Sequence, residues 1–399
     1  MINKWLTQNK LFHNLLHVGL GRTLVSLVPF LILPYLYNHY EIEKIREFSL
    51  TLASYLIFNT IIDFGTTLYG SYLTTTNFRI FFAKKILFIR IIIFIALVTF
   101  GLFFIKEKEI AIAIILSGTN LCNFNFYFQG KLKNNIILYQ DLIGRGLFLA
   151  LFFLIVSFTS NVLVGLSIGL IISNTIKIYL NRRLFKHLIF HYGPINTIHI
   201  KDFGLKAFSY GLSRYFIVAT TEANQIYIKN LGSSTIANYS IVEVFYKITK
   251  NLGSLLSQVL MPYFLEKKNK TISIQTLIYS VLGVVLTFYA LYIALPHVII
   301  GLYDADLFKQ ISQSFNLFFV ASIFTFINAV IGYPLHSLFG IVNLTNYSTI
   351  IASLIYMLII YYNRNQLSVN LVALATVISE GSNMIIRALT LLLFKKQVD

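Results

Sequence analysis

The sequence predicts an all-α, polytopic membrane protein with twelve transmembrane helices. Three observations support this fold class: of the 399 residues, 57% are hydrophobic and only 12% are charged, and the mean hydropathy is +0.73. About one quarter of the residues in an ordinary soluble domain are charged, so the composition argues against a cytosolic globular enzyme. It also argues against an intrinsically disordered chain, which needs low hydrophobicity to stay unfolded.

A helix that spans a bilayer needs about 20 mostly apolar residues, and the chain offers twelve such stretches. The first is too long for the apolar core of a signal peptide and no small-residue cleavage site follows it, so we expect it to be a membrane helix. The longest connection, 181–203, leaves no room for a soluble domain. The expected spans are 11–37, 46–68, 86–105, 110–128, 137–158, 162–180, 204–229, 234–261, 275–300, 310–336, 340–362 and 368–394.

The distribution of Lys and Arg among the short loops predicts that both termini are cytoplasmic. With this orientation six basic residues face outward, namely Lys44, Arg46, Lys106, Lys108, Lys309 and Arg364. Sixteen face inward, namely Lys4, Lys10, Arg79, Lys84, Lys85, Lys131, Lys133, Arg182, Arg183, Lys186, Lys201, Lys267, Lys268, Lys270, Lys395 and Lys396. The formal net charge of +17 therefore follows a membrane pattern, and we expect no nucleic-acid partner.

A short internal repeat divides the chain into two halves. Gly19-Leu20-Gly21-Arg22 in the first expected helix matches Gly211-Leu212-Ser213-Arg214 in the seventh, at an offset of 192 residues. Both helices enter the membrane from the cytoplasm, so the repeat is a parallel one, as in some transporters. We expect a six-helix lobe at 1–185, a cytoplasmic linker at 186–203 and a second six-helix lobe at 204–399.

Ionisable side chains inside the membrane are the main candidates for function, because they are costly in hydrocarbon and usually face a bundle interior or a cavity. Arg22 and Arg214 each lie ten or more residues into a span, too deep to reach the interface easily. An Arg side chain can donate two parallel hydrogen bonds to a phosphate. The pair could therefore flank an anion site, or each Arg could instead satisfy helix carbonyls or pair with a buried acid. Ten basic residues lie in or near the spans: Arg22, Arg90, Arg145, Lys177, Lys206, Arg214, Lys229, Lys247, Lys250 and Arg387.

Five acids lie in the spans: Asp63, Asp141, Glu222, Glu243 and Glu380. Glu243 and Lys247 have the i,i+4 order that favours a helical ion pair, which competes with a role for Lys247 and Lys250 along an anion path. Asp141 can pair locally with Arg145 in the same way. Glu222 lies in a polar segment that suits a cavity wall or helix–helix hydrogen bonding. A further hypothesis is coupling to a proton or sodium gradient through Glu222, with Asp63, Glu380 and Glu243 as the other candidates.

Several short motifs resemble those of bacterial polysaccharide (O-antigen) flippases of the Wzx type. These transporters belong to the multidrug/oligosaccharidyl-lipid/polysaccharide exporter (MOP) superfamily. One departure is the outer loop His39–Lys44, which lacks the glycines usual near its acid. The motifs are Leu33-Pro34-Tyr35-Leu36, Asp63-Phe64-Gly65, Phe126-Tyr127-Phe128-Gln129-Gly130, Ala237-Asn238-Tyr239-Ser240 and Met261-Pro262.

The resemblance implies a protein of the bacterial cytoplasmic (inner) membrane in O-antigen, capsule or lipopolysaccharide biosynthesis. The implied substrate is an undecaprenyl-pyrophosphate-linked oligosaccharide, flipped from the cytoplasmic to the periplasmic leaflet by alternating access. Two MATE-like six-helix lobes would surround a central cavity, and other polysaccharide-assembly membrane proteins are implied partners. Both Arg22 and Arg214 would contact the pyrophosphate or an acidic sugar, with Lys247, Lys250 and Arg90 as further cavity cations.

Three other functions remain open at this stage. A multidrug or small-molecule exporter of the same superfamily needs intramembrane acids, yet here bases outnumber acids. A lipid II flippase usually has two further helices. A membrane polysaccharide polymerase or glycosyltransferase would use a large outer loop or an outer pair of acids, which Glu41-x-Glu43 and Asp304-x-Asp306 match only formally.

We expect no enzymatic activity and no cofactor. The sequence offers no nucleophile–base set and no phosphate-binding loop, and it has no metal-ligand cluster. Its single cysteine, Cys122, cannot build a thiolate zinc site or an intrachain disulfide.

Overall fold

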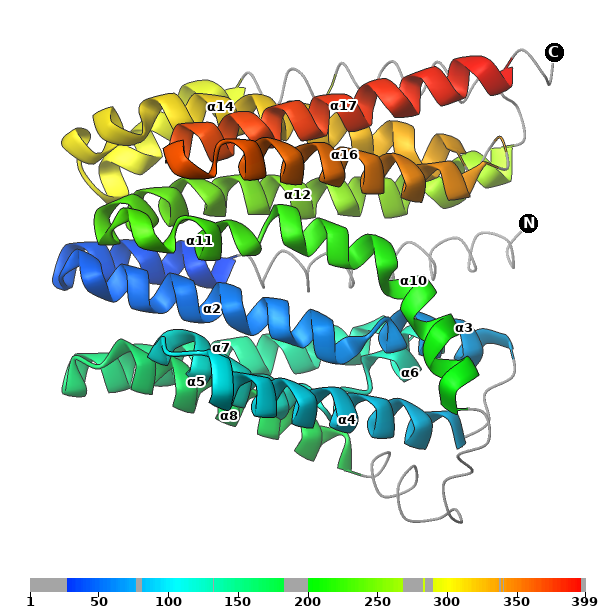
Figure 1. Ribbon diagram of the computed structural model, residues 1–399, viewed down its shortest axis with the longest axis horizontal. Helices are drawn as coiled ribbons and strands as arrows, with labels where there is room; N and C mark the ends of the chain where they lie inside the picture. The colour runs from blue at the N-terminus through cyan, green and yellow to red at the C-terminus, as the bar shows by residue number, and fades with distance from the viewer. Residues whose placement is uncertain are drawn as a thin grey trace, which may run out of the picture. The chain divides into compact units, whose positions relative to one another are not determined.

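A computed structural model of the chain describes its helices and the contacts among them (Figure 1). All regular secondary structure within the described residues is helical, so the all-α prediction is confirmed. The described residues are 27–76, 81–131, 133–182, 200–267, 290–336 and 341–395, together with Gly283 and Phe339.

The chain forms two compact units: unit 2 is Arg46–Ile226, and unit 1 joins residues 1–45 to 227–399. Their boundaries are not those expected for the two six-helix lobes, and the division at 185 and 204 stays a prediction.

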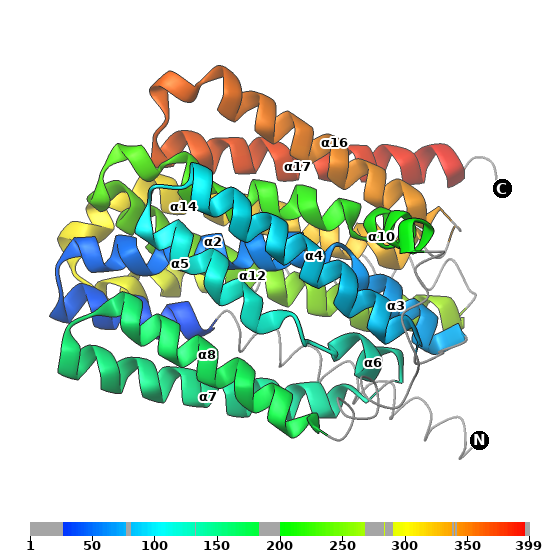
Figure 2. The ribbon, with the colours of Figure 1, turned by 60° about the horizontal axis from the view of Figure 1, so that its bottom comes forward.

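Unit 2 combines five helices of 19 to 26 residues with several shorter helical elements. α7 lies along α8, and α3 contacts both α6 and α10, as can be followed in Figure 2. Its elements are α2 (Ile42–Asp63), α3 (Thr66–Thr76), α4 (Phe81–Phe104), α5 (Lys108–Ser117), η1 (Gly118–Asn120), α6 (Asn125–Gly130), α7 (Asn134–Thr159), α8 (Val162–Leu180), α10 (Ile200–Thr220) and α11 (Ala223–Tyr227).

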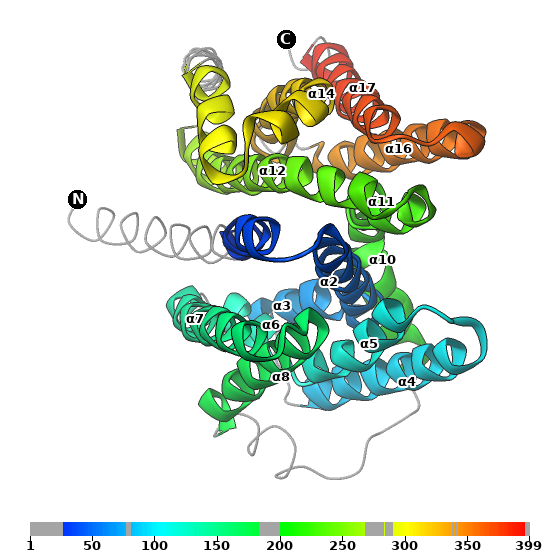
Figure 3. The same ribbon diagram turned by 90° about the vertical axis from the view of Figure 1, so that its left-hand side faces the viewer.

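Unit 1 is a bundle in which α14 packs against α12 and α17, and α16 packs against α17 (Figure 3). Residues 27–39 are also helical, and their Phe30 ring meets Phe245 of α12 edge-on, with ring centroids 5.6 Å apart. The elements are η3 (Lys229–Leu231), α12 (Ser233–Lys267), α14 (Ala305–Val330), the π-helical η4 (Ile331–Leu335), α16 (Val342–Tyr362), η5 (Arg364–Gln366) and α17 (Val369–Lys395).

The described helices are those of a multi-pass membrane protein. Among them, six are long and apolar enough to cross a membrane, and the bent pair α2–α3 makes a seventh if it is one span. The charged helices α10 and α12 are not among these, and the expected spans 11–37 and 275–300 extend beyond the described residues. A multi-pass membrane protein is thus confirmed, while the count of twelve spans stays a prediction.

Four of the expected continuous helices are interrupted, which corrects the sequence-based spans. The span 46–68 bends by 48° after Asp63, where Phe64 and Gly65 have φ angles of 48° and 74°. The span 110–128 stops at Ser117 and resumes at Asn125, and 204–229 is broken after Thr220. The span 310–336 changes to a π-helix at Ile331, beside Gly332 and Pro334. The length of an apolar stretch does not show where its helix is interrupted. The interruptions are caused by individual polar or glycine residues within the stretch.

The bend between α2 and α3 lies directly against the backbone of α10. A Cβ placed on Gly65 would clash with the Ala207 carbonyl oxygen, and one on Gly211 would lie 2.7 Å from the Gly65 Cα. Both neighbours are backbone atoms, which cannot rotate away as a side chain can. The two glycines therefore allow α10 to approach the bend closely.

We predict that Gly211→Ala destabilises the protein by about 1–3 kcal/mol, because the added methyl group overpacks this contact. Gly146→Ala is the matched control: Gly146 also lies within a helix, but a Cβ there would meet no atom within 4 Å. The measurement is thermal unfolding in detergent. Equal unfolding midpoints for the two variants would contradict the close contact.

Candidate functional site

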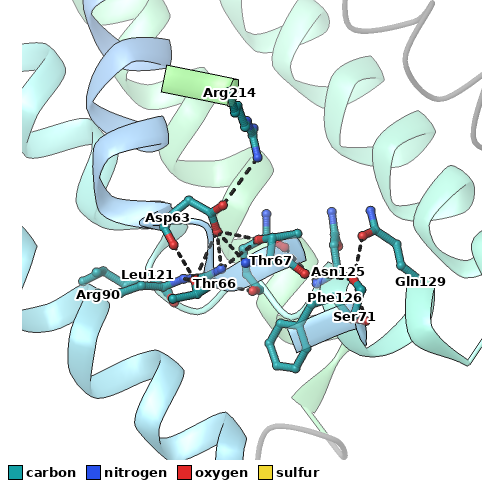
Figure 4. Close-up of polar contacts among 11 residues, drawn as sticks. Asp63, Thr66, Thr67, Ser71, Arg90, Leu121, Asn125, Phe126, Gln129 and Arg214 are labelled. Atoms are coloured by element: carbon teal, nitrogen blue, oxygen red, sulfur yellow. Dashed lines mark hydrogen bonds and ion pairs between the residues drawn. The ribbon is translucent and has the colours of Figure 1, made fainter. Parts of the chain in front are cut away.

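Asp63 lies where α2 ends, and its carbonyl and side chain organise the start of α3 (Figure 4). Thr66 Oγ1 donates to the Asp63 carbonyl oxygen at 2.5 Å, and the Thr67 amide donates to Asp63 Oδ1 at 3.2 Å. The Thr67 hydroxyl also donates to Oδ1, and the Thr66 hydroxyl shares its proton between the carbonyl oxygen and Oδ1, which lies 3.2 Å away. Asp63 therefore caps the first turn of α3, as short polar side chains commonly do at helix N-termini.

Arg90 of α4 is buried against Asp63, with a side chain that is only 3% exposed. Its Nη2 lies 2.6 Å from Asp63 Oδ1, which makes a charge-assisted hydrogen bond. The other donations of this guanidinium go to Thr66 Oγ1 and Thr67 Oγ1 at 2.9 Å, Asn123 O at 2.7 Å and Leu121 O at 3.4 Å.

These contacts connect two interrupted helices. Leu121 and Asn123 lie between η1 and α6, whereas Asp63, Thr66 and Thr67 lie at the α2–α3 bend. Irregular backbone inside a membrane protein is tolerated only where its polar groups find partners. A single Arg side chain provides such partners for both breaks.

Arg214 of α10 is the third charged member of this group, and it is held much more loosely. Its Nη1 lies 3.4 Å from Asp63 Oδ2, and its side chain is 48% exposed. Within the described part of the chain this is its one ion pair. Two guanidinium groups thus share one carboxylate, so the group of Asp63, Arg90 and Arg214, which we name the Asp63 cluster, carries one excess positive charge.

Unit 1 contains two further ion pairs in or near expected spans. Glu243 pairs with Lys247 at 3.0 Å, as the i,i+4 spacing predicts, and Tyr239 donates to the same carboxylate at 3.1 Å. Glu380 of α17 lies 3.6 Å from Lys250 of α12. It also accepts hydrogen bonds from the Tyr246 hydroxyl at 2.8 Å and from the Asn328 amide at 3.0 Å.

Arg387 stabilises the kink at which α14 becomes π-helical. Its Nη1 donates to the Asn328 carbonyl oxygen at 2.7 Å, and its Nε donates to Ser348 Oγ at 3.0 Å. A Cβ on Gly332 would lie 2.5 Å from Nη1, so the guanidinium is seated directly on that glycine. The sequence places Arg387 among the intramembrane bases, but spacing along its helix offers it no partner. Gly332 and Pro334 within an apolar run were the available signal for the kink.

The remaining predicted site residues are not brought together in the described structure. Arg22 lies outside the described residues. Glu222 is half-buried at the turn between α10 and α11. One expectation needs correction: Asp141 forms its ion pair with Lys177 of α8 at 2.6 Å rather than with Arg145. The helix α8 packs on α7 and carries Lys177 to the carboxylate, which the spacing within α7 cannot reveal.

Acids of the two pairs that we predict to lie in outer loops have structural partners. Asp304 caps α14 by accepting from the Leu307 amide at 2.5 Å, and it also accepts from the Tyr37 hydroxyl. The Tyr37 hydrogen bond, followed by that of Leu307, holds the pKa of Asp304 below its usual range. Glu43 accepts from Ser233. Among the described residues, no group of three His, Cys, Asp or Glu side chains could hold a metal ion.

We predict that Arg90→Gln destabilises the protein by about 3–5 kcal/mol, because it leaves the buried Asp63 carboxylate without its main partner. Lys309→Gln is the control, since Lys309 pairs with Asp306 at 3.3 Å on the surface with its side chain 79% exposed. Such exposed pairs contribute about 0–1 kcal/mol. The readout is the unfolding midpoint in detergent, and an Arg90 variant as stable as the Lys309 variant would refute the role of Arg90.

Comparison with known proteins supports the fold. No family model matches the sequence, and curated proteins give no match. Among solved structures, a eukaryotic MATE transporter, AtDTX14, aligns with a TM-score of 0.59 at 10% identity over 99% of this chain and 97% of its own. A mutant of the Vibrio cholerae MATE transporter VcmN gives 0.59 at 13% identity over 100% and 98%. The lipid II flippase MurJ, in an inward closed conformation, gives 0.62 at 15% identity over 92% and 87%. The chain therefore has the fold that MATE transporters and this lipid II flippase share.

Proposed function

We propose that the protein is a flippase of the bacterial inner membrane for an undecaprenyl-pyrophosphate-linked oligosaccharide, an O-antigen or capsule repeat unit. It would move this lipid from the cytoplasmic to the periplasmic leaflet by alternating access of a central cavity between two six-helix lobes. The single observation that carries the proposal is the Asp63 cluster, which carries one excess positive charge and in which the Arg214 side chain is 48% exposed. The shared fold supports it, because one protein of this fold is a lipid II flippase.

The charge of the cluster suits an anionic lipid. A pyrophosphate that crosses the membrane must leave water, and fixed cations along its path offset part of that desolvation cost. Among the described members of the predicted cation set, Arg214 is the best placed, because half of its side chain is exposed. Its planar fork can donate two parallel hydrogen bonds to a phosphate, which a lysine cannot.

The other cations proposed to contact the substrate differ from Arg214 in their ion pairing and exposure. Lys247 and Lys250 already pair with Glu243 and Glu380, and about a quarter or less of each side chain is exposed. Arg90 is fully engaged by the helix breaks, so the geometry favours Arg214 over Arg90 as a ligand. Arg22 keeps its proposed role on the basis of its sequence match to Arg214 alone.

The runner-up is a multidrug or small-molecule exporter, since MATE transporters have the same fold. An exporter of cations needs accessible intramembrane acids. In the described structure Asp63, Glu243 and Glu380 each have a basic partner within 4 Å, which favours an anionic substrate. A polymerase or glycosyltransferase is less favoured, because the outer-loop acids Glu43 and Asp304 serve helix contacts.

We predict that proteoliposomes containing the protein expose an undecaprenyl-pyrophosphate-linked oligosaccharide to an impermeant glycosidase faster than protein-free liposomes do. Arg214→Gln should slow this transfer at least about tenfold, equivalent to roughly 1.4 kcal/mol, because it removes the exposed cation. Lys309→Gln, a surface charge change of the same size, should transfer at the wild-type rate.

Transfer no faster than in protein-free liposomes would overturn the flippase proposal. Efflux of a cationic dye by the same preparation would then establish the exporter alternative. Full activity of the Arg214 variant would remove Arg214 from the proposed site.

Ion coupling is a separate part of the proposal, carried first by Glu222 and then by Asp63, Glu380 or Glu243. Glu222 is favoured because it lies at a helix break within a polar segment, the turn between α10 and α11. We predict that an imposed proton or sodium gradient accelerates transfer in the wild type and not in Glu222→Gln. Wild-type transfer that ignores both gradients would rule out coupling.

A further inference from the structure

The two carboxylate oxygens of Asp63 are used very differently (Figure 4). Oδ1 accepts from Arg90, from Thr66 and from both the amide and the hydroxyl of Thr67. Oδ2 has one ion pair among the described residues, with Arg214 Nη1 at 3.4 Å. One oxygen is thus committed to the fold of unit 2, whereas the other is available to a cation that can leave.

We propose that Asp63 is the built-in counter-anion of the substrate site. Its Oδ2 holds the Arg214 guanidinium while no substrate is bound, and a phosphate of the substrate takes its place. This inference rests on the proposed function, because it assigns Asp63 a role at the same Arg214 site. It makes Asp63 a positioning residue that sets how tightly an anion binds.

The contacts of Arg90 allow Arg214 to leave Asp63 for a phosphate without unfolding unit 2. A buried carboxylate that loses its only cation is strongly destabilised. Asp63 avoids this penalty when Arg214 leaves, because Arg90 stays 2.6 Å from Oδ1 and is itself fixed by Asn123 and Thr66. The pair of Asp63 and Arg90 is neutral with or without Arg214.

The contact between Asp63 and Arg214 has the properties of one that a ligand can replace. A distance of 3.4 Å exceeds the 2.7–2.9 Å of a strong charge-assisted hydrogen bond. The Arg214 side chain is also half-exposed, so water weakens its attraction to the carboxylate. A phosphate can offer two oxygens to the guanidinium in place of one distant oxygen.

The exchange of phosphate for Asp63 at the Arg214 guanidinium would also favour release of the substrate. A guanidinium without a counter-ion in a membrane cavity would hold an anion too firmly for turnover, since transport requires binding that can be reversed. When Asp63 Oδ2 competes for the same guanidinium, the departing phosphate is replaced by an anion that is already in place. The competition raises the KM for the substrate and raises kcat.

The test compares binding of inorganic pyrophosphate to the purified full-length protein by calorimetry. The double variant Asp63→Asn/Arg90→Gln removes the counter-anion together with its buried partner and leaves the net charge unchanged. We expect it to bind pyrophosphate about tenfold more tightly than the wild type, because Arg214 has no competing carboxylate. In the transfer assay its KM and its kcat should both fall.

The matched control is Asp141→Asn/Lys177→Gln. It removes another ion pair of unit 2, also 2.6 Å long, without changing the net charge. We expect its pyrophosphate affinity to equal that of the wild type. We expect Arg214→Gln to bind pyrophosphate at least about tenfold more weakly than the wild type.

The outcomes separate this inference from the proposed function. Binding that depends on Arg214 but is no tighter in the Asp63/Arg90 double variant would overturn only the counter-anion role. Wild-type protein that does not bind pyrophosphate would overturn the anion site as well.

A second measurement uses the wild-type protein alone, so its result does not depend on whether a variant folds. Difference infrared spectra of wild-type protein labelled with ¹³C-aspartate should show a shifted carboxylate band on pyrophosphate addition, because Asp63 loses its contact with Arg214. Saturating pyrophosphate without such a shift would overturn the proposal.

Discussion

The buried ion pair between Arg90 and Asp63 is the interaction on which the rest of unit 2 depends. Hydrocarbon offers no partners to a free backbone group, so each interruption of a membrane helix must be satisfied by the protein. Arg90 does this for two interruptions, through the Asp63-capped start of α3 and through the carbonyls of Leu121 and Asn123. The α2–α3 bend then meets α10 at Gly65 and Gly211, which brings Arg214 within 3.4 Å of Asp63.

This arrangement separates structural from functional charge. A buried pair contributes little net stability but is costly to break, so Arg90 and Asp63 are best understood as fixing one geometry. Arg214 adds the charge that the pair does not neutralise, and it does so from a half-exposed position. The bases of unit 1 show the contrasting case: Lys247, Lys250 and Arg387 each have acids or carbonyls close by, and Arg387 supports the kink beside Gly332.

The sequence predicted the all-α membrane fold and the Glu243–Lys247 pair, because the first follows from composition and the second from spacing along one helix. It did not predict that Arg90 would serve two helix breaks, or that Asp141 would pair with Lys177 on another helix. Such contacts depend on which helices become neighbours, and apolar periodicity does not encode this choice. The breaks themselves had partial signals in Asp63-Phe64-Gly65 and in Gly332 with Pro334, where residue chemistry disfavours a continuous helix.

The central claim is that Asp63 and Arg90 remain paired while Arg214 is the cation that meets the substrate. A cryo-electron microscopy structure of the full chain with inorganic pyrophosphate tests it most directly. We expect the anion within hydrogen-bond distance of Arg214, with Arg90 still bound to Asp63 Oδ1 and with Arg214 no longer in contact with Oδ2. Pyrophosphate bound away from Arg214, or Arg90 drawn from Asp63 to the anion, would contradict it.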